Sequence, residues 1–85
     1  MFSIKWQPKA RKQVSKIRDM TARIDIDEAV TSLANFPNAK NVKSLTNHQY
    51  GYRLRVGNYR VLFDADTEIR IIDIQEVKKR DDHTY

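Results

Sequence analysis

Tyr52-Arg53-Leu54-Arg55-Val56-Gly57-Asn58-Tyr59-Arg60-Val61-Leu62-Phe63 is the stretch that decides the fold of this chain. Gly57-Asn58 is a two-residue turn with glycine first, which suits a type II′ hairpin between two strands. Such a turn fixes the register, so Val56 is expected opposite Tyr59. Side chains alternate across a strand, and one face of the hairpin therefore carries a predicted core of Tyr52, Leu54, Val56, Tyr59, Val61 and Phe63.

The opposite face, which we call the arginine face, carries Arg53, Arg55, Arg60 and Leu62. The register places Arg55 directly opposite Arg60, and like charges in that position cost a few tenths up to about 1 kcal/mol. Guanidinium groups on a rigid sheet suit phosphate oxygens, so a single-stranded RNA backbone is a natural ligand. The alternative is a solvated face that carboxylates of the next strand neutralise, namely Glu68, Asp73 and Glu76.

The rest of the chain predicts an α+β fold with the order β-α-α-β-β-β. Alternating Phe2, Ile4 and Trp6 indicate a first strand, and apolar residues with helical spacing indicate two helices. The expected architecture is a small antiparallel sheet with the two N-terminal helices packed on one face. The expected elements are a strand at 2–6, helices at 8–20 and 24–35, a loop at 37–48, strands at 50–56, 59–64 and 68–77, and a polar tail at 78–85.

Composition bounds the possible functions. The 85 residues predict a single domain over 1–85, and a net charge of +5 favours an anionic partner. The absence of cysteine excludes a disulfide scaffold, a thiolate zinc site and a cysteine nucleophile. His48 and His83 are far apart, so we expect no metal and no cofactor. The N-terminus lacks an apolar signal segment and no stretch is long enough to span a bilayer, which predicts a cytoplasmic protein without a membrane partner.

The chemistry that these residues can support is RNA cleavage. No serine–histidine–aspartate set, phosphate-binding loop or zinc spacing is present. RNA supplies its own nucleophile, the 2′-hydroxyl, so a protein need only align it, stabilise negative charge and move protons. Arginines meet the second need. Candidates for proton transfer are Lys78, Lys79, His83 and Tyr85.

Four segments together resemble the RelE/ParE superfamily of bacterial toxins, and most closely its RelE branch. They are Val42-Lys43-Ser44-Leu45, the hairpin from Tyr52 to Phe63, Ile72-Asp73-Ile74, and the basic stretch that ends in Tyr85. The resemblance implies a toxin of a type II toxin–antitoxin pair that cuts mRNA in the ribosomal A site. The 2′-hydroxyl attacks the adjacent phosphate without a metal ion, and the implied partners are a cognate antitoxin, the ribosome and mRNA.

The resemblance also implies roles for individual residues. Basic residues of the first hairpin strand fall on Arg53 and Arg55, where the best-known members have lysine, and the arginine of the return strand falls on Arg60. The late basic residue falls on Lys79 or Arg80, and the C-terminal tyrosine falls on Tyr85. Arginine stays protonated, so if the family's base is one of those lysines, its role must move here, for example to Tyr85, Lys79 or His83. Further RNA contacts are expected from Lys43, Lys78 and His83.

Two other functions fit the same residues. A ParE-like inhibitor of DNA gyrase has a similar hairpin and needs no RNA chemistry. A non-catalytic RNA-binding domain would bind free RNA with a strong salt dependence and would not cut it.

Overall fold

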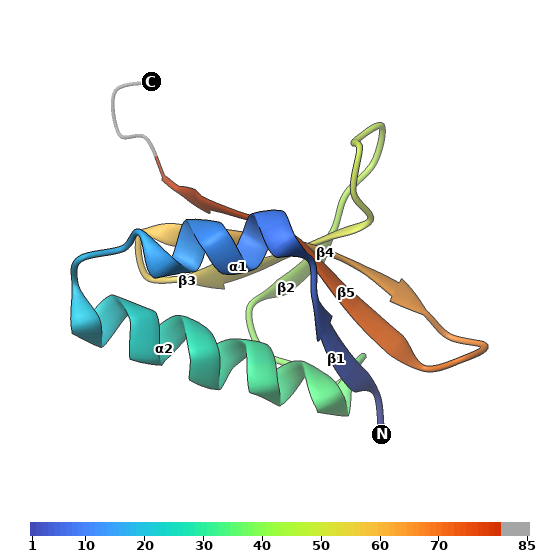
Figure 1. Ribbon diagram of the computed structural model, residues 1–85. Coiled ribbons are helices and arrows are strands. Elements are labelled where there is room, and N and C mark those ends of the chain that lie inside the picture. Colours follow the sequence, from blue (N-terminus) through green and yellow to red (C-terminus); the bar gives the residue numbers. More distant parts are fainter. Residues whose placement is uncertain (81–85) are drawn as a thin grey trace.

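The computed structural model describes residues 1–80 and contains two helices packed against a five-stranded sheet (Figure 1). The elements in chain order are β1 (Ser3–Trp6), α1 (Pro8–Ser15), α2 (Met20–Thr31), a short 3₁₀ helix η1 (Ser32–Asn35), β2 (Val42–Ser44), β3 (Tyr52–Val56), β4 (Tyr59–Asp66) and β5 (Ile71–Lys79).

The expected fold class is confirmed, with two corrections to the sheet. The strand order is β1-β5-β4-β3-β2, and β1 runs parallel to β5 while every other pair is antiparallel. The sheet is therefore mixed, because alternation along residues 2–6 predicts a strand but not the direction of its neighbour. The predicted loop at 37–48 also contains a strand, β2, which pairs with β3 through Val42–Ser44.

Local hydrogen bonds explain where the observed bounds differ from the predicted ones. Asp19 caps α2, since its carboxylate accepts from the backbone N–H groups of Thr21 and Ala22. The second helix therefore begins at Met20 instead of residue 24. The Asp66 carboxylate accepts from the N–H groups of Glu68 and Ile69 and stabilises the turn between β4 and β5. This turn delays the start of β5 to Ile71, after the predicted residue 68.

The predicted hairpin register is confirmed at every position. Val56 pairs with Tyr59, Arg55 with Arg60, and Arg53 with Leu62. Gly57 has a φ of 55° and no other residue of the turn has a positive φ, as a type II′ turn requires. No part of residues 1–80 forms a helix long and apolar enough to cross a membrane.

The core lies between the helices and one side of the sheet. Ile26, Val30 and Leu33 of α2 and η1 are buried against residues of β3, β4 and β5 that include Leu54, Val61, Phe63, Ile72 and Ile74. Phe36 closes one end through edge-to-face contacts with Phe2, Tyr52 and Phe63. Both helices cover the same side, so the opposite side of the sheet stays open.

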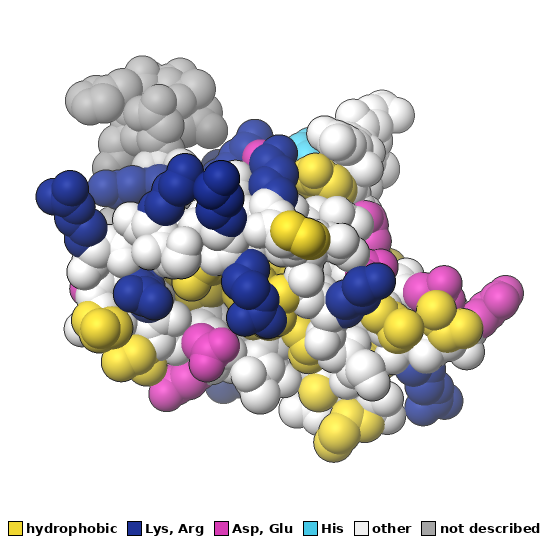
Figure 2. Space-filling model, viewed as in Figure 1, with side chains coloured by type: hydrophobic (Ala, Val, Ile, Leu, Met, Phe, Trp, Pro, Cys, Tyr) yellow, Lys and Arg dark blue, Asp and Glu magenta, His cyan; other side chains and the backbone are white. Residues whose placement is uncertain are grey.

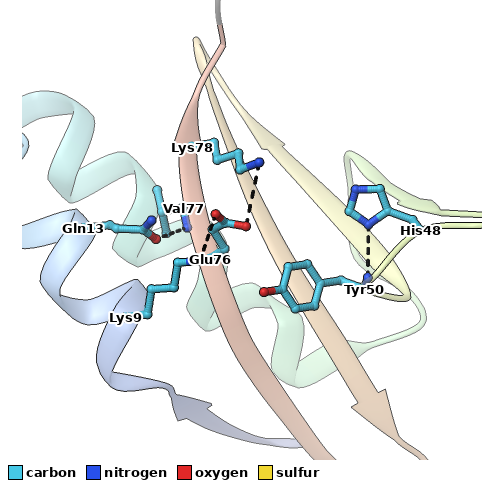
Figure 3. Close-up of polar contacts among 7 residues, drawn as sticks. All are labelled: Lys9, Gln13, His48, Tyr50, Glu76, Val77 and Lys78. Atoms are coloured by element: carbon cyan, nitrogen blue, oxygen red, sulfur yellow. Dashed lines mark hydrogen bonds and ion pairs between the residues drawn. The ribbon is translucent and has the colours of Figure 1, made fainter.

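Helix α1 covers the edge of β5 that β1 leaves unpaired. Strand β1 pairs only with residues 71–74 of β5. Beyond that point, the Gln13 side-chain oxygen accepts from the Val77 backbone N–H at 2.7 Å (Figure 3), and Ala10 of the same helix is fully buried. The helix thus satisfies a strand edge that would otherwise be available for pairing with another chain.

Candidate nucleic-acid interface

A row of three cationic side chains crosses the open side of the sheet next to the hairpin turn. Arg55 of β3 lies opposite Arg60 of β4, and Arg60 lies opposite Lys78 of β5. We call Arg55, Arg60 and Lys78 the cationic row. Because the three residues lie on neighbouring paired strands, the sheet itself holds their side chains next to one another.

A second row lies one step further from the turn. Lys43 of β2 lies opposite Arg53 of β3, Arg53 lies opposite Leu62, and Leu62 lies opposite Glu76. Leu62 is only 5% exposed although it is on the open side. The two rows together place Lys43, Arg53, Arg55, Arg60 and Lys78 on one continuous surface.

The carboxylates of the next strand do not neutralise the arginines. Glu76 pairs with two lysines, Lys9 at 3.3 Å and Lys78 at 3.9 Å (Figure 3). Asp73 accepts instead from the Gln7 side-chain amide at 3.0 Å. Within residues 1–80, no acidic side chain forms an ion pair with an arginine of the arginine face. These guanidinium groups therefore keep their donors available for an external anion.

Charge on the open side is divided between its two ends. Asp64 and Asp73 lie opposite each other on β4 and β5, further from the hairpin turn than the two basic rows. Asp64 accepts from the Gly51 N–H at 2.8 Å and from the Gln75 amide at 3.2 Å. Most of the basic side chains therefore lie at the hairpin end, where Glu76 accompanies them, and Asp64 and Asp73 lie at the other end, where Lys5 is opposite Asp73.

The register of β5 separates the two candidates for the late basic residue. Lys79 lies opposite Tyr59, on the side of the helices, where it lines a groove with Lys16 and Arg18. Arg80 follows, and its backbone N–H donates to the Asn58 carbonyl oxygen. Alternation along this extended strand places Arg80 on the same side as Lys78. The structure therefore brings Arg80, and not Lys79, to the side of the arginine face. Tyr85 and His83 lie outside the described residues.

The loop between β2 and β3 adds two aromatic side chains that the sequence analysis did not assign to the site. Figure 3 looks onto the open side of the sheet, and there the Tyr50 ring lies over β4 and points toward β5, beside His48. The ring centroids of His48 and Tyr50 are 6.0 Å apart. The available signal was an aromatic residue directly before Gly51 at the start of a basic strand.

Positive charge also covers the side of the helices. Figure 2 shows Lys and Arg side chains over α1 and its surroundings, where Lys9, Arg11 and Lys12 are exposed. Net charge alone therefore does not select an interface, and the distinguishing property of the open side is the fixed register of its cations. Residues 1–80 hold no group of three or more histidine, aspartate or glutamate side chains placed to bind a metal ion.

The fold is that of RelE toxins in solved structures. The RelBE2 complex from Mycobacterium tuberculosis has a chain with 22% identity and a TM-score of 0.78, covering 93% of this chain and 98% of its own. The RelE–RelB complex from Pyrococcus horikoshii gives 21% identity and a TM-score of 0.79 over 95% and 97%. The isolated E. coli RelE toxin gives 16% identity and a TM-score of 0.79 over 95% and 86%.

The sequence itself defines the family. Residues 4–83 match the sequence model of the ParE toxin of the type II toxin–antitoxin system parDE. The chain therefore belongs to the ParE toxin family within the RelE/ParE superfamily, and it is a toxin of a type II toxin–antitoxin system. The predicted superfamily is confirmed. No curated protein matches the sequence.

Proposed function

We propose that this toxin is an endonuclease that cuts mRNA in the ribosomal A site. The observation that carries the proposal is the row of Arg55, Arg60 and Lys78, whose arginines have no acidic partner within residues 1–80. Opposed cations reduce folding stability and therefore favour a function that needs concentrated positive charge. Phosphoryl transfer needs such charge on the phosphate oxygens.

The proposed reaction is an internal transesterification. A base removes the proton of the 2′-hydroxyl, the 2′-oxygen bonds to the adjacent phosphorus, and the bond from phosphorus to the 5′-oxygen breaks. The leaving 5′-oxygen takes up a proton, and the products are a 2′,3′-cyclic phosphate and a 5′-hydroxyl end. Arg55 and Arg60 stabilise the charge that builds on the phosphate, with Arg53 and Arg80 beside them, and Lys43 and Lys78 bind neighbouring phosphates.

Proton transfer needs a group other than these arginines, which stay protonated. Lys79 lies on the side of the helices, so we assign this role to the segment that follows Arg80. The sequence offers Tyr85 and His83 there. The ribosome would hold the mRNA so that the 2′-hydroxyl is aligned with the adjacent phosphate, and this alignment lowers the barrier to the reaction.

A cognate antitoxin is the second proposed partner. Family membership places the chain in a toxin–antitoxin system, and two of the similar structures are RelE–RelB complexes. We infer that the antitoxin of this system binds the toxin and blocks its activity.

Inhibition of DNA gyrase is the alternative that a specific observation favours. The sequence model that matches residues 4–83 is that of the ParE toxin, and such a protein would act without RNA chemistry. A gyrase supercoiling assay with excess toxin separates the two functions, because only the alternative predicts loss of supercoiling.

Cleavage of programmed ribosomes tests the proposal directly. Purified toxin is incubated with mRNA on ribosomes with an empty A site and with the same RNA free in solution, and primer extension maps the cut sites. We expect cuts only on the ribosome and a loss of at least about 100-fold in Arg60→Ala, as for removal of one oxyanion-stabilising donor. Arg70→Ala is the matched control, because Arg70 is exposed in the turn after β4. A folded wild-type protein that makes no cut would overturn the proposal.

A further inference from the structure

We propose that His48 and Tyr50 form a stacking platform for a base of the RNA strand whose phosphates bind the arginine face. The inference rests on the proposed function, since it assigns a base contact to the same substrate. Its basis is a pair of aromatic rings that the loop between β2 and β3 holds on the open side of the sheet (Figure 3).

The loop is held at its base by one backbone hydrogen bond and one bond to a side chain of the sheet. The Leu45 N–H donates to the Gly51 carbonyl at 2.8 Å, and the Gly51 N–H donates to the Asp64 carboxylate at 2.8 Å. Asp64 follows Leu62 by two residues on β4, so its side chain lies on the open side. A Cβ at Gly51 would lie 3.3 Å from this carboxylate, and glycine therefore permits the close approach. A loop that is held in this way loses little conformational entropy when it binds a ligand.

The two rings are oriented by their own loop. The Tyr50 backbone N–H donates to His48 Nδ1 at 3.0 Å, which places the imidazole proton on Nε2. The ring planes are inclined at 46° with centroids 6.0 Å apart. His48 is exposed and Tyr50 is half-buried. One aromatic surface thus remains accessible to a base, and Nε2–H adds a hydrogen-bond donor beside it.

The platform lies close to the cations that would bind the backbone. Tyr50 precedes Arg53 by three residues, so their Cα atoms are within about 10 Å of each other. Arg53 belongs to the surface that holds Arg55 and Arg60. Proteins that bind single strands combine a cationic groove for the phosphates with aromatic side chains for the bases. The open side of this sheet carries both cations and aromatic rings, and the loop that holds the rings is hydrogen-bonded to Asp64 through Gly51 and leads into the strand of Arg53.

The test compares ring removal with ring retention. Tyr50→Ala and His48→Ala remove a ring, Tyr50→Phe keeps the ring without its hydroxyl, and Gln49→Ala is the control from the same exposed loop. Each protein is assayed for cleavage on programmed ribosomes. Each is also assayed by fluorescence anisotropy for binding to a labelled 2′-O-methyl RNA, which lacks the nucleophile. Thermal unfolding shows whether each variant is folded.

We expect each alanine variant at Tyr50 and His48 to lose about 5- to 100-fold in cleavage and in RNA binding, in line with base stacking. Gln49→Ala should stay within about 2-fold of the wild type, and Tyr50→Phe should lose less than Tyr50→Ala because it keeps the ring. If Tyr50→Ala does not fold, exposed His48 still provides the test.

Two results would overturn the platform, and they are distinguishable. If the wild type cuts mRNA and Arg60→Ala does not, while the His48 and Tyr50 alanine variants keep full cleavage and binding, the platform is wrong and the proposed function stands. If the wild type neither cuts mRNA nor binds the 2′-O-methyl RNA, the proposed function fails and the platform falls with it.

Discussion

Arg55 and Arg60 show how one pair of residues ties folding to function. Their Cα atoms are partners in the hairpin, where like charges oppose folding. The repulsion is not relieved by an acidic neighbour in the described part of the chain. The same repulsion makes the position attractive to a phosphate, because a bound anion removes it. We therefore expect these two side chains to lower folding stability and to favour the binding of an anion.

Replacing either arginine by threonine should separate these two effects. We expect Arg55→Thr and Arg60→Thr each to raise the free energy of unfolding by a few tenths up to about 1 kcal/mol and to reduce mRNA cleavage. Urea denaturation of the single and double variants forms a double-mutant cycle. The repulsion is refuted if the two changes in unfolding free energy are zero or simply additive.

Gly57 makes a purely conformational contribution to the hairpin. Its φ is 55°, and a Cβ built there meets no atom within 4 Å. Gly57→Ala should therefore destabilise the fold by about 1 to 2 kcal/mol through backbone strain alone. Thermal unfolding measures this change. Asn58→Ala, in the same turn with a negative φ, serves as the control and should have a smaller effect.

At the scale of elements, the sequence predicts where strands and helices lie better than it predicts which strands pair with each other. The hairpin register follows from Gly57-Asn58 because a two-residue turn leaves no freedom. The parallel pairing of β1 with β5 and the three-residue strand β2 do not follow, since both depend on distant partners. The bounds of α2 and β5 depend on side-chain bonds of Asp19 and Asp66.

One irregularity decides which tail residues reach the site. The register between β4 and β5 shifts at Leu62/Phe63, where Gln75 is the extra residue. Such a bulge exchanges the faces of all later residues. Without it, Val77 would lie opposite Arg60, and Lys79 would share the arginine face. A local sequence pattern does not reveal the shift, so the sequence alone does not tell which of Lys79 and Arg80 lies on the side of the arginine face.

The contact between α1 and β5 gives a prediction at this scale. Gln13→Ala removes the acceptor of the Val77 N–H and uncovers a strand edge. We expect a loss of about 1 to 3 kcal/mol in unfolding free energy and increased self-association. Chemical denaturation and light scattering are the measurements. Lys12→Ala, on the exposed side of the same helix, should change stability by less than about 0.5 kcal/mol. Equal effects of the two variants would contradict the edge-covering role.

At the scale of the whole molecule, the number of cations on the open side predicts the salt dependence of RNA binding. Five of these cations form the two basic rows, namely Lys43, Arg53, Arg55, Arg60 and Lys78. If all five bind phosphates of a single strand, the logarithm of the binding constant should fall with the logarithm of salt concentration at a slope of about −3 to −4.

Substitutions locate the surface that produces this slope. Arg60→Ala should make it less steep by about 0.7, and Lys12→Ala on α1 should leave it unchanged. Anisotropy titrations of a 2′-O-methyl RNA at several salt concentrations measure both. If Lys12→Ala changes the slope and Arg60→Ala does not, the RNA binds on the side of the helices, where Figure 2 shows further basic residues.

The division of charge along the open side also acts before any contact forms. The cations at the hairpin end outnumber the one carboxylate there, Glu76, whereas Asp64 and Asp73 outnumber Lys5 at the other end, and this difference gives the open side an electric dipole in the plane of the sheet. The field of a polyanion exerts a torque on such a dipole and turns the hairpin end toward the negative charge. We therefore expect a polyanionic target to meet the hairpin end first, which raises the share of productive collisions.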